Sequence, residues 1–225
     1  MRKPPSRRLP PIRQLLEVMA ALRAPDGCPW DREQDHLSLR FHAVEEVYEL
    51  LDAIEAGDDV EMAEELGDLL LQVVFHAQLA GERGAFDFDR LTQVIVDKLV
   101  RRHPHVFGDA TVKDVDQVWA NWEAIKRAEK AGSKHERKSA LDGIPRHLPA
   151  LMKVQKLVKK AGKAGLPVGK SGASRRTKAE VARSLFDLAQ ACQDKGWSAE
   201  ELLRAELARR EKALRKAEAA ATKGA

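Results

Sequence analysis

The stretch Glu45-Glu46-Val47-Tyr48-Glu49, followed after fifteen residues by Glu65-Leu66-Gly67-Asp68, decides the fold of this 225-residue chain. Both clusters lie in windows whose apolar residues recur at helical spacing, which predicts two amphipathic helices with acidic sides. The glycine and aspartates at 57–59 predict a turn that folds the two helices back on each other as a hairpin.

This hairpin would bring four carboxylates together. Residues three apart are neighbours on a helix, so Glu46 pairs with Glu49 and Glu65 pairs with Asp68. At about 5 Å and an effective dielectric of about 20, two carboxylates repel by roughly 3 kcal/mol, so four require protonation or a cation. Oxygen ligands without Cys or His suit Mg²⁺ or Mn²⁺ rather than zinc. The alternative is an exposed acidic helix face that is solvated by water and neighbouring basic side chains.

The composition indicates an all-α globular protein. Hydrophobic residues make up 44% of the chain, charged residues 33% and aromatic residues only 5%, and β-branched alternation is nearly absent. We expect a cytoplasmic protein without membrane contacts, because no apolar run is long enough to span a bilayer and the Pro- and Arg-rich start lacks a signal core. Cys28 and Cys192 match no zinc or disulfide spacing.

Charge is distributed unevenly along the chain. Residues 141–225 hold 19 Lys+Arg and 9 Asp+Glu, a net charge of +10, which leaves 20 against 26, or −6, for residues 1–140. The acidic half carries the candidate metal site. The basic half could attract nucleic acid, or it could steer a polyphosphate substrate toward the protein.

We expect a disordered start, a catalytic domain, a linker with a connecting helix, a flexible basic loop and a last helical segment, at residues 1–10, 11–130, 131–162, 163–178 and 179–225. Helical stripes are expected at about residues 12–22, 37–56, 59–83, 88–102, 141–162, 179–195 and 198–221. Residues 28–31 are expected to form a loop. Gly67, in the middle of a helix, predicts close approach of a neighbour or ligand.

Several side chains are candidates for binding a ligand beside the acidic cluster. Trp30 could stack on a base or plug its loop into the core, and His36 could reach a phosphate or sugar or be a solvated polar residue. Asp35 is expected to cap the following helix. Trp122 and Lys126, one turn apart, could hold a nucleotide, although Trp122 could equally anchor its helix to the bundle or to a second subunit.

A helix expected at residues 88–102 places cations where its apolar stripe should continue. Lys98 and Arg102 continue the stripe of Leu91 and Ile95, and Arg101 lies beside them. Such long side chains can snorkel out of a core. The alternative is that they face the acidic cluster and bind phosphates bridged to the metal.

Several motifs in the same order resemble MazG, the family of all-α nucleoside triphosphate pyrophosphohydrolases. The similarity covers about residues 12–162 and rests on five stretches, 27–31, 45–49, 64–70, 97–107 and 122–126. The resemblance implies Mg²⁺ held by Glu46, Glu49, Glu65 and Asp68, with Lys98, Arg102, Trp122 and Lys126 at the nucleotide. It also implies a four-helix bundle completed by a homodimer or higher oligomer.

Longer members of the family carry two such modules in tandem, and this chain departs from that pattern. Residues 179–186 lie where a second acidic motif would stand, but Arg183 replaces its metal-binding Asp. The preceding Glu-x-x-Glu helix is replaced by the basic loop. We therefore expect a degenerate second module without a metal site.

The hypothesis is a Mg²⁺-dependent enzyme that hydrolyses a nucleoside triphosphate between the α and β phosphates. Lys98 and Arg102 would stabilise developing charge, and Glu45 or Glu64 would orient or deprotonate the water. One alternative is a narrower substrate, such as dUTP, dCTP or a phosphoribosyl nucleotide. Another is a helical protein without enzyme activity that binds nucleic acid or a partner through its basic half.

Overall fold

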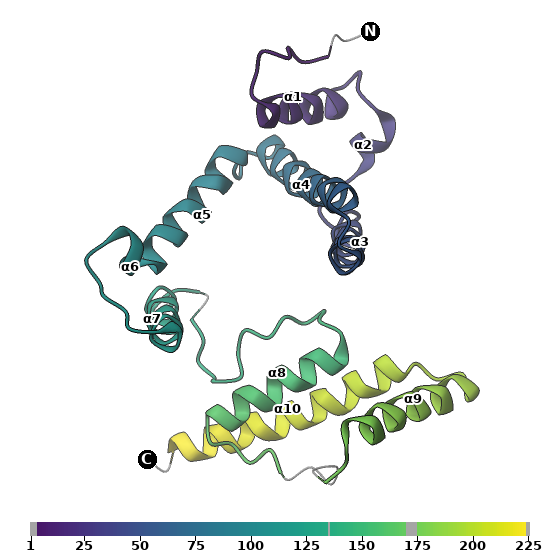
Figure 1. The fold of residues 1–225 in the computed structure, drawn as a ribbon, viewed down its shortest axis with the longest axis vertical. Coiled ribbons are helices and arrows are strands. Elements are labelled where there is room, and N and C mark those ends of the chain that lie inside the picture. Colours follow the sequence, from purple (N-terminus) through teal and green to yellow (C-terminus); the bar gives the residue numbers. More distant parts are fainter. Residues whose placement is uncertain (1–3, 135, 170–174, 224–225) are drawn as a thin grey trace. The chain divides into compact units, whose positions relative to one another are not determined.

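In the computed structural model, residues 4–134, 136–169 and 175–223 are described, and every regular element within these ranges is a helix (Figure 1). The all-α prediction is confirmed. Residues 1–3 of the expected disordered start and residues 170–174 of the expected flexible loop lie outside the described residues. The chain divides into two compact units, Met1–Val115 and Asp116–Ala225. The predicted domain end at residue 130 would add the next helix to the first unit, and it stays a prediction.

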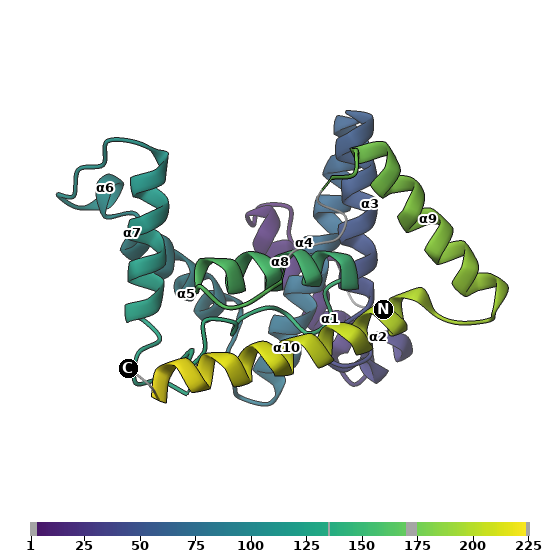
Figure 2. The ribbon, with the colours of Figure 1, turned by 90° about the horizontal axis from the view of Figure 1, so that it is seen from below.

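The first unit is built around a hairpin of two long helices. Its elements are α1 (Pro11–Arg23), α2 (Pro29–Glu33), α3 (His42–Ala56), α4 (Asp59–Glu82), α5 (Phe88–Arg102) and α6 (Pro104–Phe107). Helices α3 and α4 lie side by side (Figures 1 and 2). Gly57 ends α3 with φ +68°, a left-handed conformation that suits glycine, and Asp58 Oδ1 accepts the N–H groups of Val60 and Glu61. The chain therefore reverses direction within the two residues Gly57 and Asp58.

The core of this unit lies between α1 and α4. Met19 of α1 packs with Val74, Phe75 and Leu79 of α4, and Leu39 from the segment before α3 completes the buried cluster. Helix α4 contributes more of the described core than any other helix, as its apolar run predicts. This packing fixes one side of α4, which leaves its first turns to present polar side chains.

Two predictions of where helices form in the first unit were wrong. The helix expected from Leu37 begins at His42, because Asp35 Oδ1 accepts the N–H groups of Leu37 and Ser38, both at 2.7 Å, and closes a turn instead. Residues 28–31 were expected to form a loop, but residues from Pro29 onward form the short helix α2. Proline favours the first position of a helix because its fixed φ angle is already helical.

Arg23 ties this turn region to the core helices. Its Nε and Nη2 donate to the two carboxylate oxygens of Glu82 at 2.7 Å each, and its Nη1 donates to the carbonyl oxygens of Asp31 and Gln34. The hydrogen bonds from Arg23 hold the pKa of Glu82 below its usual range. The end of α1 thereby positions the segment that carries Trp30 and His36.

The second unit contains α7 (Val115–Ala128) except for its first residue, and the whole of α8 (Ala150–Lys163), α9 (Lys178–Asp194) and α10 (Ala199–Lys223). Helices α8 and α10 lie side by side over a core that includes Leu141, Leu157 and Leu214 (Figure 2). The helix expected from Leu141 begins only at Ala150, because Pro149 is extended and forms the helix boundary.

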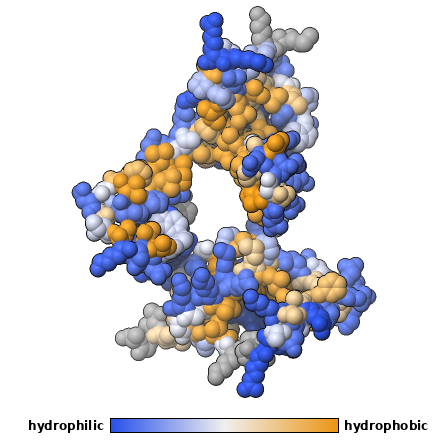
Figure 3. All heavy atoms as spheres, in the orientation of Figure 1, coloured by the Kyte–Doolittle hydropathy of each residue, from blue (hydrophilic) through white to orange (hydrophobic). Residues whose placement is uncertain are grey.

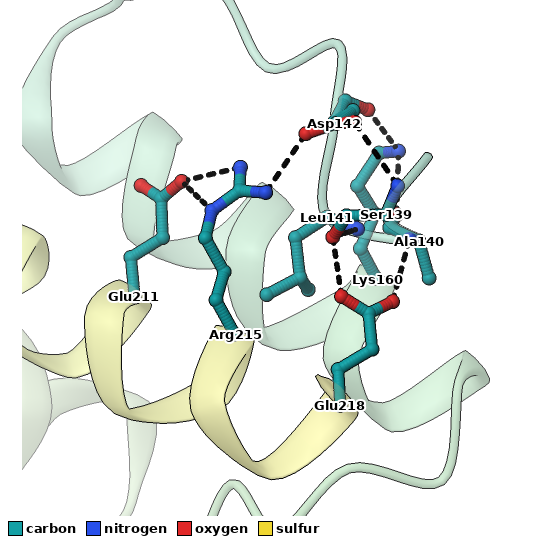
Figure 4. A network of polar contacts seen from close by, with 8 residues as sticks. All are labelled: Ser139, Ala140, Leu141, Asp142, Lys160, Glu211, Arg215 and Glu218. Carbon is teal, nitrogen blue, oxygen red and sulfur yellow. Dashed lines mark hydrogen bonds and ion pairs between the residues drawn. The ribbon is translucent and has the colours of Figure 1, made fainter. Parts of the chain in front are cut away.

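A polar network fastens the segment before α8 to α10 (Figure 4). Arg215 donates to Asp142 Oδ1 at 2.8 Å and to Glu211, while Glu218 Oε1 accepts the N–H of Ala140 at 2.7 Å. Lys160 of α8 donates to the Asp142 carbonyl oxygen at 2.7 Å. Burial opposes ionisation of Asp142, but Arg215 and a backbone N–H outweigh it, so the pKa of Asp142 is lowered.

We predict that Arg215→Ala lowers the free energy of unfolding of the second unit by about 1 kcal/mol, because both partners of the lost contacts are partly exposed. Urea unfolding followed by tryptophan fluorescence measures this change. Arg209→Ala, which removes an exposed pair with Glu206 on the same helix, is the control and should cost less. Equal losses in the two variants would contradict the anchoring role.

Candidate metal centre

Three carboxylates from the hairpin converge in the first unit. Glu46 and Glu49 of α3 and Glu65 of α4 each offer an oxygen, and these oxygens lie within 4.8 Å of one another. Glu46 and Glu49 are three residues, nearly one turn, apart on α3 and so share a face, and the packing of α3 on α4 brings Glu65 to that face. The charged neighbours that shift the pKa values of Glu46 and Glu65 are all carboxylates.

Asp68 stands at the edge of this group, half-buried on α4. Burial raises the pKa of Glu46, and the carboxylate of Asp68 raises it further. Burial also raises the pKa of Glu65, with the carboxylates of Glu49 and Asp68 adding to the effect. The four side chains predicted as ligands therefore repel one another, so the cluster is short of positive charge.

The donor set fits a hard divalent cation. Glu65 Oε2 is buried and has no hydrogen-bond partner within the described parts of the chain. A buried anionic oxygen without a partner is costly, and a cation is the counter-charge that removes the cost. Carboxylate oxygens are the ligands that Mg²⁺ and Mn²⁺ prefer.

Gln72 also contacts this cluster, although its residue type gave no signal in the sequence. The side chain lies on α4, seven residues after Glu65, and its Nε2 donates to Glu46 Oε1 at 3.3 Å. Its position on the same helical stripe as Glu65 and Asp68 is the signal that could have identified it.

The two other acidic candidates are exposed and flank the ligands. Glu45 Oε2 lies 3.7 Å from His42 Nδ1, and the His42 ring meets Trp30 edge-on at 6.2 Å. Trp30 is 53% exposed, so it does not plug the core. Glu64 is exposed on α4. The structure thus places Trp30 against His42 in the first turn of α3, and the same histidine lies near Glu45.

His36 faces another histidine. Its Nδ1 lies 2.9 Å from Nδ1 of His76 on α4, and the rings stack at 5.1 Å between centroids with an angle of 11°. One Nδ1 must donate and the other must accept, so the contact holds a single proton. Burial and the neighbouring His36 lower the pKa of His76. His36 therefore makes its polar contact with another side chain of the protein, His76, which lies one turn after Gln72 on α4.

The basic candidates of α5 are placed differently. Lys98 and Arg102 are half-buried and Arg101 is exposed. Helix α5 packs on α4 and α6 but, among the described elements of this single chain, not on α3. No described side chain of α5 is fully buried. The chain alone does not bring these cations against the Glu-x-x-Glu pair of α3.

Trp122 and Lys126 belong to the second unit, which is described by itself. Lys126 Nζ lies 5.3 Å from the centre of the Trp122 ring, and Trp119 meets Trp122 edge-on at 5.6 Å. The cation and the ring therefore face the same way, as their spacing predicts. Their contact with a nucleotide stays a prediction.

Gly67 does not serve close packing within the described chain. A Cβ added at this position would meet no described atom within 4 Å. The expectation of a close neighbour was therefore wrong for the described part of the single chain. The surface beside Asp68 is open at this point.

We predict that His76→Phe reduces the loss of stability on acidification. Because the folded pKa of His76 is lowered, the unfolded chain binds the proton first, so stability falls as pH drops below about 6.5. Phe keeps a ring against His36 but cannot titrate. Urea unfolding at pH 7.5 and pH 5.5 measures the difference, with exposed His147→Phe as control. An unchanged pH dependence in His76→Phe would contradict the coupling.

The acidic cluster lies in a segment that matches a known protein family. Residues 34–107 match the model of the MazG nucleotide pyrophosphohydrolase domain, and this range contains the whole acidic cluster. The chain is 50% identical over 155 residues to the nucleoside triphosphate pyrophosphohydrolase of Escherichia coli K12, which covers 68% of this chain and 58% of that protein. The chain thus spans little more than half the length of that relative.

Two further similarities are of different kinds. An uncharacterized 26.1 kDa protein of Streptomyces cacaoi is 47% identical over 169 residues, covering 73% of this chain and 67% of that protein. The crystal structure of a MazG-related protein from Thermotoga maritima aligns with a TM-score of 0.44 and 24% identity, over 51% of this chain and 97% of that one. No helix in the described ranges is both long and apolar enough to cross a membrane. By its domain match and its sequence identity to these relatives, the chain belongs to the MazG family.

Proposed function

We propose that this chain is a Mg²⁺-dependent nucleoside triphosphate pyrophosphohydrolase. Water would be added across the anhydride between the α and β phosphates, which yields a nucleoside monophosphate and pyrophosphate. The observation that carries the proposal is the convergence of Glu46, Glu49 and Glu65, with Asp68 beside them, in a group whose carboxylates raise the pKa values of Glu46 and Glu65. The names of relatives at about half identity support the same reaction.

The acidic cluster would hold the metal through Glu46, Glu49, Glu65 and Asp68, with Mn²⁺ as a substitute for Mg²⁺. Bound Mg²⁺ would polarise the phosphate, lower the pKa of a bound water and neutralise the charge of the leaving pyrophosphate. The chain's own part would be to hold the carboxylates in place through the packing of α3 on α4.

Other residues would act on the substrate and the water. Glu45 or Glu64, exposed beside the ligands, would orient the attacking water or accept its proton. The cations Lys98, Arg101 and Arg102 of α5 would bind the phosphates. The base would be held by aromatic and polar side chains, for which the candidates are Trp30, His36, Trp122 and Lys126.

A second copy of the chain would complete the site. Apolar side chains of α5 that are 40–49% exposed are Val94, Ile95, Val96, Leu99 and Val100. Similarly exposed side chains of α3 are Val44, Val47, Tyr48, Leu51 and Ile54. Figure 3 shows hydrophobic surface gathered over α4 and α5 of the first unit. A patch of this kind favours a homodimer or higher oligomer, and a monomeric mass by light scattering would contradict it.

We predict that Glu49→Gln lowers pyrophosphate release by about 100-fold or more, because the variant loses a ligand charge while keeping the side-chain shape. Pyrophosphate is measured with a panel of NTPs and dNTPs in the presence of Mg²⁺. Exposed Glu55→Gln, on the same helix, is the control and should retain activity.

Inactivity of the wild-type protein on every nucleotide would overturn the proposed reaction. Equal activity of Glu49→Gln and Glu55→Gln would overturn the metal assignment. Activity confined to dUTP, dCTP or a phosphoribosyl nucleotide would narrow the substrate without changing the site.

We also predict that Mg²⁺ raises the melting temperature of the wild-type protein after dialysis against EDTA. Binding to the folded state alone stabilises it by about 2.7 kcal/mol when the ion is present at 100 times its dissociation constant. Differential scanning fluorimetry measures the shift. The shift should disappear in a Glu46→Gln/Glu65→Gln double variant and persist in Glu55→Gln. A shift that survives in the double variant would place the ion elsewhere.

A further inference from the structure

Gln72 occupies a position on α4 that none of the proposed roles explains. It follows Glu65 by seven residues and Asp68 by four, so its side chain leaves the helix on the face that carries those carboxylates. The residue is only 8% exposed, and it is one of two polar side chains in the buried set of the described chain. An amide in such a place requires partners for both of its ends.

One end of the amide has a partner and the other has none. Gln72 Nε2 donates to Glu46 Oε1 at 3.3 Å, which links α4 to a ligand on α3. Gln72 Oε1 is buried, and no described residue donates to it. Buried side-chain oxygens are nearly always paired, so this acceptor calls for a donor from outside the chain.

The orientation of the amide is fixed by its neighbour. If the amide were flipped, its oxygen would face the carboxylate oxygen of Glu46, and two acceptors would meet without a proton. The donor end therefore belongs on Glu46 and the acceptor end remains free. A hydrated Mg²⁺ offers the missing donor, because this ion keeps several of its water molecules when carboxylates bind it.

We propose that Gln72 is a positioning residue of the metal centre: its Nε2 orients the Glu46 carboxylate, and its Oε1 accepts a hydrogen bond from a water of the bound cation. The inference rests on the proposed function only in its need for a divalent cation at the acidic cluster. Side chains that orient metal ligands in this way typically change metal affinity by 10- to 100-fold when they are replaced.

The first test compares two glutamine variants of the full chain. Gln72→Met keeps the length of the side chain but removes both hydrogen-bonding groups, and Gln78→Met removes a Gln–Glu contact of 3.0 Å elsewhere on the same helix. Mn²⁺ binding is measured by electron paramagnetic resonance. We expect roughly 10- to 100-fold weaker binding in Gln72→Met and unchanged binding in Gln78→Met. Wild-type affinity in Gln72→Met would overturn the inference.

Stability separates a positioning role from a packing role. Gln72→Met replaces a half-paired buried amide by an apolar side chain of similar size, so its stability without metal should match or exceed that of the wild type. A loss of metal affinity accompanied by equal stability supports positioning. Weaker binding that merely follows a lower melting temperature would overturn it.

NMR of the wild-type protein tests the same inference without depending on the folding of any variant. The side-chain amide resonances of Gln72 should shift on titration with Mg²⁺, whereas those of Gln78 should not. Unshifted Gln72 resonances at saturating Mg²⁺ would overturn the inference. A double-mutant cycle tests whether Gln72 acts through Glu46. In a Glu46→Gln background, Gln72→Met should cause much less further loss of Mn²⁺ affinity.

These outcomes are distinct from failure of the proposed function. Wild-type protein that binds Mn²⁺ and releases pyrophosphate, together with a Gln72→Met variant of unchanged affinity, refutes only the role of Gln72. Wild-type protein that binds Mn²⁺ but hydrolyses no nucleotide refutes the reaction and leaves the role of Gln72 testable. Wild-type protein that binds no divalent cation refutes both.

Discussion

The mutual repulsion of the carboxylates on the hairpin of α3 and α4 is the constraint on which the site depends. Burial and the neighbouring acidic groups raise the pKa values of Glu46 and Glu65, so the folded chain holds these groups together at a cost. The packing of α1 on α4, through Met19, Val74 and Phe75, supplies the stabilisation that offsets it. A cation placed among these carboxylates would relieve their repulsion.

Helix α4 links the hydrophobic core to the acidic cluster, because one of its faces is buried in the core and another carries the polar side chains of the cluster. Its apolar residues form the core of the first unit, while Glu65, Gln72 and His76 face other partners. Gln72 reaches Glu46 on α3, and His76 reaches His36 in the turn before α3. The polar contacts of α4 therefore add to the hydrophobic packing that holds α3 and the turn before it.

Much of the fold could be predicted from local patterns. The helix limits of α4 and α5 follow from their apolar stripes, from the capping by Asp58 and Asp87, and from glycine at the turn. The predictions failed where side chains or prolines decide the local conformation. Asp35 closes a turn instead of capping α3, and α2 forms where a loop was expected. Such choices depend on hydrogen bonds that residue periodicity does not contain.

The sequence by itself determined that this chain is helical, that two acidic clusters lie on consecutive helices, and that a short turn folds them together, because spacing fixes which side chains share a helix face. Only the tertiary structure decided which of these oxygens meet, that Gln72 joins them, and that His36 pairs with His76. Those contacts depend on how α3 and the turn before it pack against α4, and this packing is set by the whole core rather than by any single motif.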